Sequence, residues 1–125
     1  MSQPPDISVI ITTYKVPSYI ARAVNSALTQ TGVSVEVIIV DDCSPDATWD
    51  VIQTLTDPRI TAIRMEQNGG PSAARNRAIA AAKGRWLAVL DGDDLFLEGR
   101  LARMLALGEA KQADIIVDKD RKSVV

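Results

Sequence analysis

Short apolar runs that alternate with helix-patterned segments constrain this chain more than any other feature. Five runs are rich in β-branched residues and too short for helices, which predicts buried strands over 7–13, 33–40, 60–65, 85–90 and 113–117. Between them apolar residues recur at helical spacing, over about 17–30, 49–55, 73–82 and 97–108. This alternation predicts an α/β fold, a doubly wound and mostly parallel sheet with helices on both faces.

Four of the predicted strands end in polar turns. The turns are Thr12-Thr13-Tyr14, Asp41-Asp42, Asn68-Gly69-Gly70 and Asp91-Gly92-Asp93-Asp94. Because parallel strands all end at the same edge of a sheet, we expect these turns to form one polar crevice. Ligands of open α/β sheets bind in that crevice.

The acidic turn after the fourth run is a candidate metal site. Asp93, with Asp91 or Asp94, can offer carboxylate oxygens to Mg²⁺ or Mn²⁺, which are typically held by one or two carboxylates together with substrate phosphates. The alternative is an ordinary Asp-Gly turn in which Asp94 caps the following helix. Three carboxylates directly after a buried strand favour metal or ligand binding.

Composition excludes several classes of function. The 125-residue chain is long enough for one domain, and its net charge of -2 argues against a nucleic-acid surface. It contains one cysteine and no histidine, so intrachain disulfides, histidine-based zinc sites and Ser-His-Asp or Cys-His catalysis within the chain are excluded. No apolar run approaches the ~20 residues that a membrane span needs.

The remaining strand ends carry groups suited to a nucleotide. Asp41 and Asp42 can accept hydrogen bonds from a base imide or a ribose hydroxyl, or they can form a helix-capping pair with Ser44. Tyr14 can stack on a base or lie half-buried at the surface. Arg75, near the start of the third predicted helix, is a candidate phosphate partner or part of a solvated helix face.

With these residues in place, the chain resembles the amino-terminal half of a family 2 glycosyltransferase of GT-A fold. The resemblance runs from about Ile7 to Leu107. Four segments carry it in the family's order: SVIITTY at 8–14, VEVIIVDDCS at 35–44, NGGPSAARN at 68–76, and LDGDD at 90–94, which matches the D-x-D motif. The family often has Gly or Asn where this chain has Cys43.

The resemblance implies a nucleotide-sugar donor, with a UDP-sugar as the default, and a divalent cation, Mn²⁺ or Mg²⁺. It also implies the site residues. By the family pattern these are Thr12 and Tyr14 in the base pocket, Asp42 on the base with Asp41 supporting the turn, Asn68 and Arg75 facing the donor crevice, Asp91 near the ribose and metal, and Asp93 on the metal and diphosphate.

The resemblance further implies inversion at the anomeric carbon by direct displacement, in polysaccharide or glycan biosynthesis. Family members continue into an acceptor-binding half that supplies the general base. We therefore expect residues 1–125 to be a truncated donor-binding half that binds a donor but turns over poorly without an acceptor half. Truncation predicts an exposed apolar surface and self-association. The expected acceptor is a sugar, lipid-linked or polysaccharide group, and the expected location is the cytoplasm or the inner face of the membrane.

Three other classes remain as alternatives. A non-catalytic nucleotide-binding module shares every feature of the donor site. A phosphoacceptor receiver domain would carry its acidic pair after the first strand, whereas Asp41-Asp42 follows the second. A nucleotidyltransferase would carry a glycine-rich, basic loop after the first strand, where this chain has Thr12-Thr13-Tyr14-Lys15.

Overall fold

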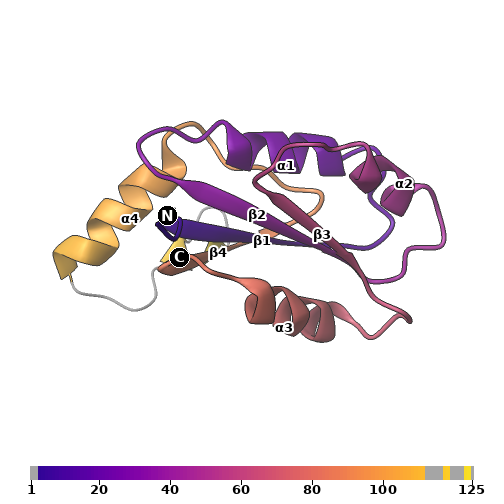
Figure 1. Ribbon diagram of the computed structural model, residues 1–125. Helices are drawn as coiled ribbons and strands as arrows, with labels where there is room; N and C mark the ends of the chain where they lie inside the picture. The colour runs from indigo at the N-terminus through magenta and orange to yellow at the C-terminus, as the bar shows by residue number, and fades with distance from the viewer. Residues whose placement is uncertain (1–2, 112–116, 119–122, 125) are drawn as a thin grey trace.

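Four parallel strands form the central sheet of the computed structural model, which describes residues 3–111, 117–118 and 123–124 (Figure 1). The strands are β1 (Ile7–Thr13), β2 (Val35–Asp41), β3 (Ile60–Arg64) and β4 (Trp86–Asp91), in the order β3-β2-β1-β4. Strands β1 and β2 lie in the centre and are almost entirely buried, which explains their nearly continuous apolar sequence. The predicted parallel sheet is confirmed.

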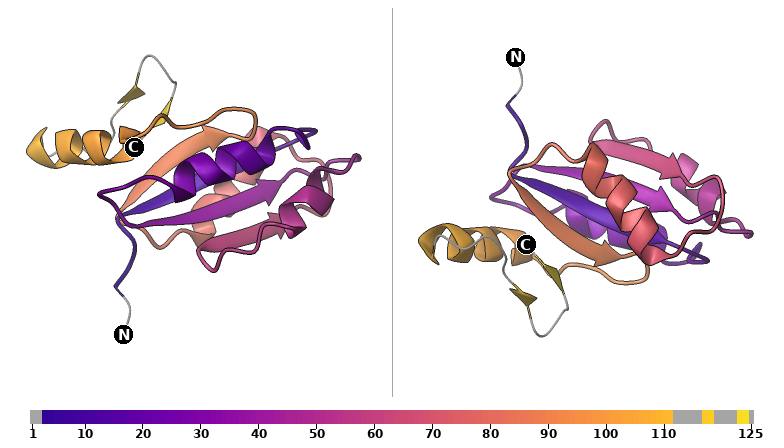
Figure 2. Two further views of the ribbon diagram at one scale, coloured as in Figure 1. Left: turned by 90° about the horizontal axis from the view of Figure 1, so that it is seen from above. Right: turned by 90° about the horizontal axis from the view of Figure 1, so that it is seen from below.

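Helices cover both faces of this sheet, as predicted. Helix α1 (Ile20–Leu28) and α2 (Thr48–Gln53) lie on one face, and α3 (Pro71–Ala81) lies on the other (Figures 1 and 2). Helix α4 (Arg100–Lys111) packs its buried residues into the same core cluster as α1. Alternation along β1 divides the two cores: Val9 and Ile11 face the α1 side, and Ile10 faces α3.

One expectation about the carboxyl-terminal part requires correction, and a second lies mostly outside the described residues. Helix α4 begins at Arg100, after Gly99 at φ +74°, and continues through Gly108, where we predicted its end. A glycine inside a helix costs about 1 kcal/mol, which burial of Leu101, Met104 and Leu105 outweighs. The predicted fifth strand lies mostly outside the described residues; β5 (Val117–Asp118) pairs antiparallel with β6 (Ser123–Val124).

Within the described residues, every helix is too short or too polar to cross a membrane.

A hydrogen-bond network closes the amino-terminal edge of the sheet, opposite the polar turns. The Ser8 hydroxyl donates to Glu36 Oε2 and accepts the Gly84 amide at 2.7 Å. Glu36 Oε2 also accepts the Lys83 amide at 2.6 Å, so the connection from α3 to β4 is fixed against β1 and β2. A Cβ atom on Gly84 would lie 2.6 Å from the Ser8 nitrogen, which leaves no room for a side chain.

We predict that Gly84→Ala lowers the free energy of unfolding by about 1–3 kcal/mol, because the added methyl has to displace the backbone of β1. Urea denaturation followed by the fluorescence of Trp49 and Trp86 measures the change. Gly69→Ala is the matched control, because its Cβ would meet only the Ala73 methyl at 3.3 Å. Equal stability of the two variants would contradict the packing role of Gly84.

Candidate functional site

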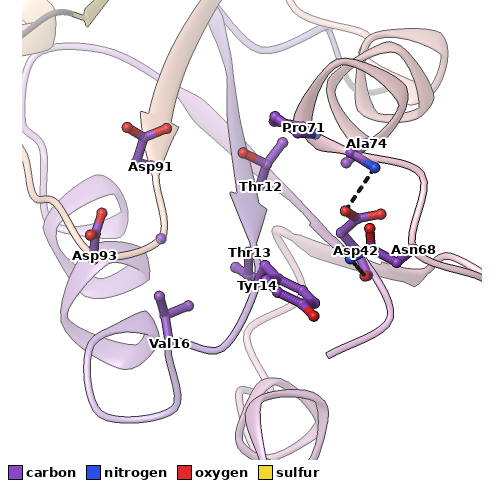
Figure 3. A pocket seen from close by; sticks show the side chains of 12 residues that line it. Thr12, Thr13, Tyr14, Val16, Asp42, Asn68, Pro71, Ala74, Asp91 and Asp93 are labelled. Atoms are coloured by element: carbon purple, nitrogen blue, oxygen red, sulfur yellow. Dashed lines mark hydrogen bonds between the residues drawn. The ribbon is translucent and has the colours of Figure 1, made fainter. Parts of the chain in front are cut away.

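A pocket of about 420 Å³ lies where β1, β2 and β4 end (Figure 3). Its size lies in the range of sites for small molecules and cofactors. All four polar turns contribute to it, so the strand-end crevice predicted from the sequence is present. The lining residues are Thr12, Thr13, Tyr14, Val16, Asp42, Asn68, Gly70, Pro71, Ala74, Asp91, Gly92 and Asp93.

The carboxylates of Asp91 and Asp93 lie on one side of the pocket, across from Asp42 and Asn68 (Figure 3). The acidic turn is closed by the Asp94 amide, which donates to the Asp91 carbonyl at 3.0 Å. It is joined to the end of β1 by the Gly92 amide, which donates to the Thr12 carbonyl at 3.1 Å. A Cβ atom on Gly92 would lie 2.9 Å from the Thr13 methyl, so this close approach requires glycine.

The donor set on this side fits a hard divalent cation that is shared with a phosphorylated ligand. Asp91 and Asp93 are exposed, and among the described residues neither carboxylate has a hydrogen-bond or ion-pair partner. Nowhere in the described part of the chain do three acidic or thiol groups gather into a complete metal site. Two carboxylates plus phosphate oxygens and water is the usual environment of Mg²⁺. Asp94 is no cap for α4, since it lies six residues before the helix.

The opposite wall is built around Asp42, which is 5% exposed. Its Oδ1 accepts the Gly69 amide at 2.8 Å and its Oδ2 accepts the Gly70 amide at 3.0 Å. The Asn68 side chain donates to the Asp42 carbonyl at 3.2 Å. The glycine amides before α3, which would otherwise suit an anionic ligand, are therefore engaged by a carboxylate of the protein itself.

Asp41 and Arg75 are the two predicted site residues that do not line the pocket. The Asp41 side chain is completely buried, and its carboxylate accepts the Thr13 hydroxyl at 2.8 Å, the Ser44 hydroxyl at 2.6 Å and the Ser44 amide at 2.9 Å. Arg64 Nε lies 3.9 Å from the same carboxylate. Asp41 thus hydrogen-bonds to residues at the strand ends and lies outside the pocket lining, so its implied role in supporting the turn remains a prediction.

Arg75 lies in α3 and is partly buried. Its Nε is buried and has no hydrogen-bond partner among the described residues. Its predicted contact with a phosphate remains a prediction, because the structure places the side chain outside the pocket lining.

Two hydroxyl groups hold the loop of residues 14–16, which contributes Tyr14 and Val16 to the pocket lining. The Lys15 amide donates to Ser44 Oγ and the Val16 amide donates to Thr48 Oγ1, both at 3.0 Å. Lys15 has φ +57°, a left-handed conformation that these bonds help to maintain. Asp46 accepts the Thr48 hydroxyl and amide, and these bonds lower the pKa of Asp46.

The Tyr14 ring, carried by this loop, is 44% exposed, and Lys15 Nζ lies 5.2 Å from its centroid. Its stacking on a base remains a prediction.

The residues that sequence reasoning missed are small or apolar. Val16, Pro71 and Ala74 line the pocket without any donor or acceptor side chain, so no chemical pattern identified them. Gly70 offered a partial signal, because its φ of +91° favours glycine at the start of α3.

We predict that Asp41→Asn lowers the free energy of unfolding by about 2 kcal/mol, because the amide turns an NH₂ group toward buried donors. Chemical denaturation measures the loss. Asp57→Asn is the control, since Asp57 pairs with Arg59 at the exposed surface. The supporting role of Asp41 would be refuted by a cost no larger than that of the control.

Cys43 has φ +59°, which explains why Gly or Asn suits this position. We predict that Cys43→Asn raises the free energy of unfolding by about 0.5–1 kcal/mol, because Asn adopts the left-handed conformation more readily. Cys43→Ser is the matched control and should give no gain. A thermal melt of the three proteins makes the comparison, and equal gains from Asn and Ser would contradict this explanation.

Comparison with known proteins shows the family of this chain. Residues 8–122 match the family model Glycosyl transferase family 2. The succinoglycan biosynthesis protein ExoO of Rhizobium meliloti (strain 1021) is 47% identical over 114 residues, which are 91% of this chain and 33% of that protein. WfaP of Escherichia coli, a UDP-Glc:alpha-D-GlcNAc-diphosphoundecaprenol beta-1,3-glucosyltransferase, is 39% identical over 106 residues, 85% of this chain and 42% of that protein. The chain thus spans less than half the length of these relatives.

Solved structures show the same fold. TarS 1-349 of S. aureus in complex with UDP-GlcNAc superposes with a TM-score of 0.82 at 30% identity, over 90% of this chain and 33% of that chain. The mannosyltransferase PcManGT from Pyrobaculum calidifontis, in complex with GDP-Man and Mn²⁺, gives a TM-score of 0.69 at 25% identity, over 78% of this chain and 30% of that chain. The predicted fold and family are confirmed, and the chain belongs to glycosyl transferase family 2.

Proposed function

We propose that residues 1–125 form the donor-binding half of a glycosyltransferase that moves a sugar from a nucleotide-diphosphate sugar to an acceptor in polysaccharide biosynthesis. The observation that carries the proposal is the pocket itself, in which two unpaired carboxylates face a wall that carries Asp42 and Asn68. Relatives whose names specify succinoglycan biosynthesis and a UDP-Glc donor support polysaccharide synthesis and a UDP-sugar.

The Asp42 side is proposed to hold the base. A carboxylate has about four lone-pair sites, and the two glycine amides leave Asp42 able to accept a further hydrogen bond. The imide N–H of uracil is a suitable donor, whereas a ring nitrogen that only accepts would meet repulsion. The exposed ring of Tyr14 offers a stacking surface beside it, and the Thr12 side chain completes this part of the lining.

The acidic side is proposed to hold the diphosphate through Mn²⁺ or Mg²⁺. Asp93 would be the main ligand, with Asp91 close to both the cation and the ribose. A bound cation would supply Lewis-acid stabilisation to the departing nucleoside diphosphate. Asp91 and Asp93 are exposed and unpaired in the described structure, so they are free for this role.

The acceptor side of the reaction needs a base to take the proton of the attacking hydroxyl. Because Asp91 and Asp93 are assigned to the cation, we place this base outside the described residues. The proposed reaction is a direct displacement with inversion, and the proposed acceptor is a sugar, lipid-linked or polysaccharide group. We also propose that the chain self-associates and that it acts in the cytoplasm or at the inner membrane face. Arg75 is still proposed to face the nucleotide-sugar donor.

We predict that UDP binds the chain at least about tenfold more tightly in the presence of Mn²⁺, and that Asp93→Ala removes this gain while the thermal melting point is kept. Isothermal titration calorimetry with UDP, GDP and dTDP, with and without Mn²⁺, measures the effect and identifies the base. Glu98→Ala is the control, since Glu98 is an exposed acid outside the pocket. The proposed function fails if none of the nucleotides binds at millimolar concentration with Mn²⁺ present.

A further inference from the structure

Among the described residues, the segment that leaves the acidic turn pairs with no strand. Residues 92–99 connect β4 to α4. The incoming side of the turn is fixed by β4 and by the Gly92 amide on the Thr12 carbonyl. The outgoing side, from Leu95 onward, needs other partners for its backbone polar groups.

Two side chains supply those partners, Ser26 in α1 and Gln30, which lies two residues after α1 ends. Ser26 Oγ accepts the Phe96 amide at 3.0 Å. Gln30 Nε2 donates to the Leu97 carbonyl at 2.9 Å, and Gln30 Oε1 accepts the Leu101 amide at 3.0 Å. These three hydrogen bonds join residues that are 67 to 71 positions apart in the chain.

Gln30 is well suited to this position. It is 8% exposed, and its Nε2 also donates to the Ser26 carbonyl at 3.1 Å, so its amide uses both a donor and an acceptor function. A glutamate would only accept, and an asparagine is too short to reach both backbone groups. Loss of the side chain would leave buried backbone groups unsatisfied, at a cost of about 1–3 kcal/mol each.

Helix α1 is anchored at its other end to the loop of residues 14–16. The amides of Tyr19 and Ile20 both donate to the carbonyl of Val16, which lines the pocket, at 3.1 Å. Helix α1 therefore connects the loop beside the base pocket to the segment that follows the acidic turn.

We propose that Gln30 and Ser26 are positioning residues for Asp91 and Asp93. They fix the outgoing side of the acidic turn from a distance and so set the geometry in which the two carboxylates can share a cation. This inference rests on the proposed function, because it assigns the cation to that turn. Groups outside a metal site that orient its ligands typically change metal affinity by about 10–100-fold when removed.

The experiment compares Gln30→Ala, Ser26→Ala and Ser26→Thr with the unaltered chain. The ratio of the UDP dissociation constants without and with Mn²⁺ is measured by calorimetry. We expect this ratio to fall by about tenfold in the two alanine variants, while UDP affinity without metal changes by less than about twofold. Ser26→Thr keeps the hydroxyl and should restore the ratio.

A second readout needs neither metal nor nucleotide. Amide hydrogen exchange of Gly92 and Asp94, which close the turn, should accelerate in both alanine variants and not in Ser26→Thr. Ser8→Ala is the matched control, because it removes a buried hydroxyl at the opposite edge of the sheet and should lower stability without changing either readout.

The inference is overturned if Gln30→Ala and Ser26→Ala fold and keep both the ratio of UDP dissociation constants and the slow amide exchange of Gly92 and Asp94. It is overturned equally if Ser8→Ala reproduces their losses, since the effect would then be general destabilisation. If Gln30→Ala does not fold, the comparison of Ser26→Ala with Ser26→Thr tests the inference. If the unaltered chain shows no metal effect, the proposed function fails, and amide exchange alone still decides whether the two residues position the turn.

Discussion

One carboxylate, buried where three strands end, holds the carboxyl edge of the sheet together. Asp41 accepts hydrogen bonds from Thr13 at the end of β1 and from Ser44 in the following turn, and its carbonyl accepts the amide of Met65 beyond β3. Burying an ionised group is costly unless it is fully hydrogen-bonded, and three bonds to the carboxylate meet that need. These bonds tie together the strand ends from which the pocket is built.

The alternation of side chains along a strand explains why the next residue has a different role. Asp41 points into the protein, and Asp42 points into the pocket, where it binds the amides of Gly69 and Gly70. One carboxylate therefore organises the strand ends while its neighbour organises the loop before α3. In the proposed complex the phosphate groups would lie at the opposite wall, where a cation would offset their repulsion with Asp91 and Asp93.

The elements of this fold were predictable because burial leaves a strong periodic signal. The β-branched runs of β1 and β2 and the apolar spacing of α1 identified both type and order. The different burial of Asp41 and Asp42 was not readable from the apolar run that precedes them, and only the family resemblance separated the two residues. Val16 and Ala74 line the pocket without a chemical signature, and α4 passes Gly108 because distant core packing outweighs local propensity. Ser26 and Gln30 act through bonds to backbone groups about 70 residues away, which no local pattern encodes.

The strand order β3-β2-β1-β4 has a consequence for synthesis of the chain on the ribosome. Strand β1 pairs with β2 early, but its other neighbour, β4, begins at Trp86, some 73 residues after Thr13. At ~5–20 residues per second, that edge waits roughly 4–15 s for its partner. During this time a strand whose residues are almost all buried in the folded protein presents unpaired amides and carbonyls. Such an edge is the type that pairs with other chains in error and that chaperones cover.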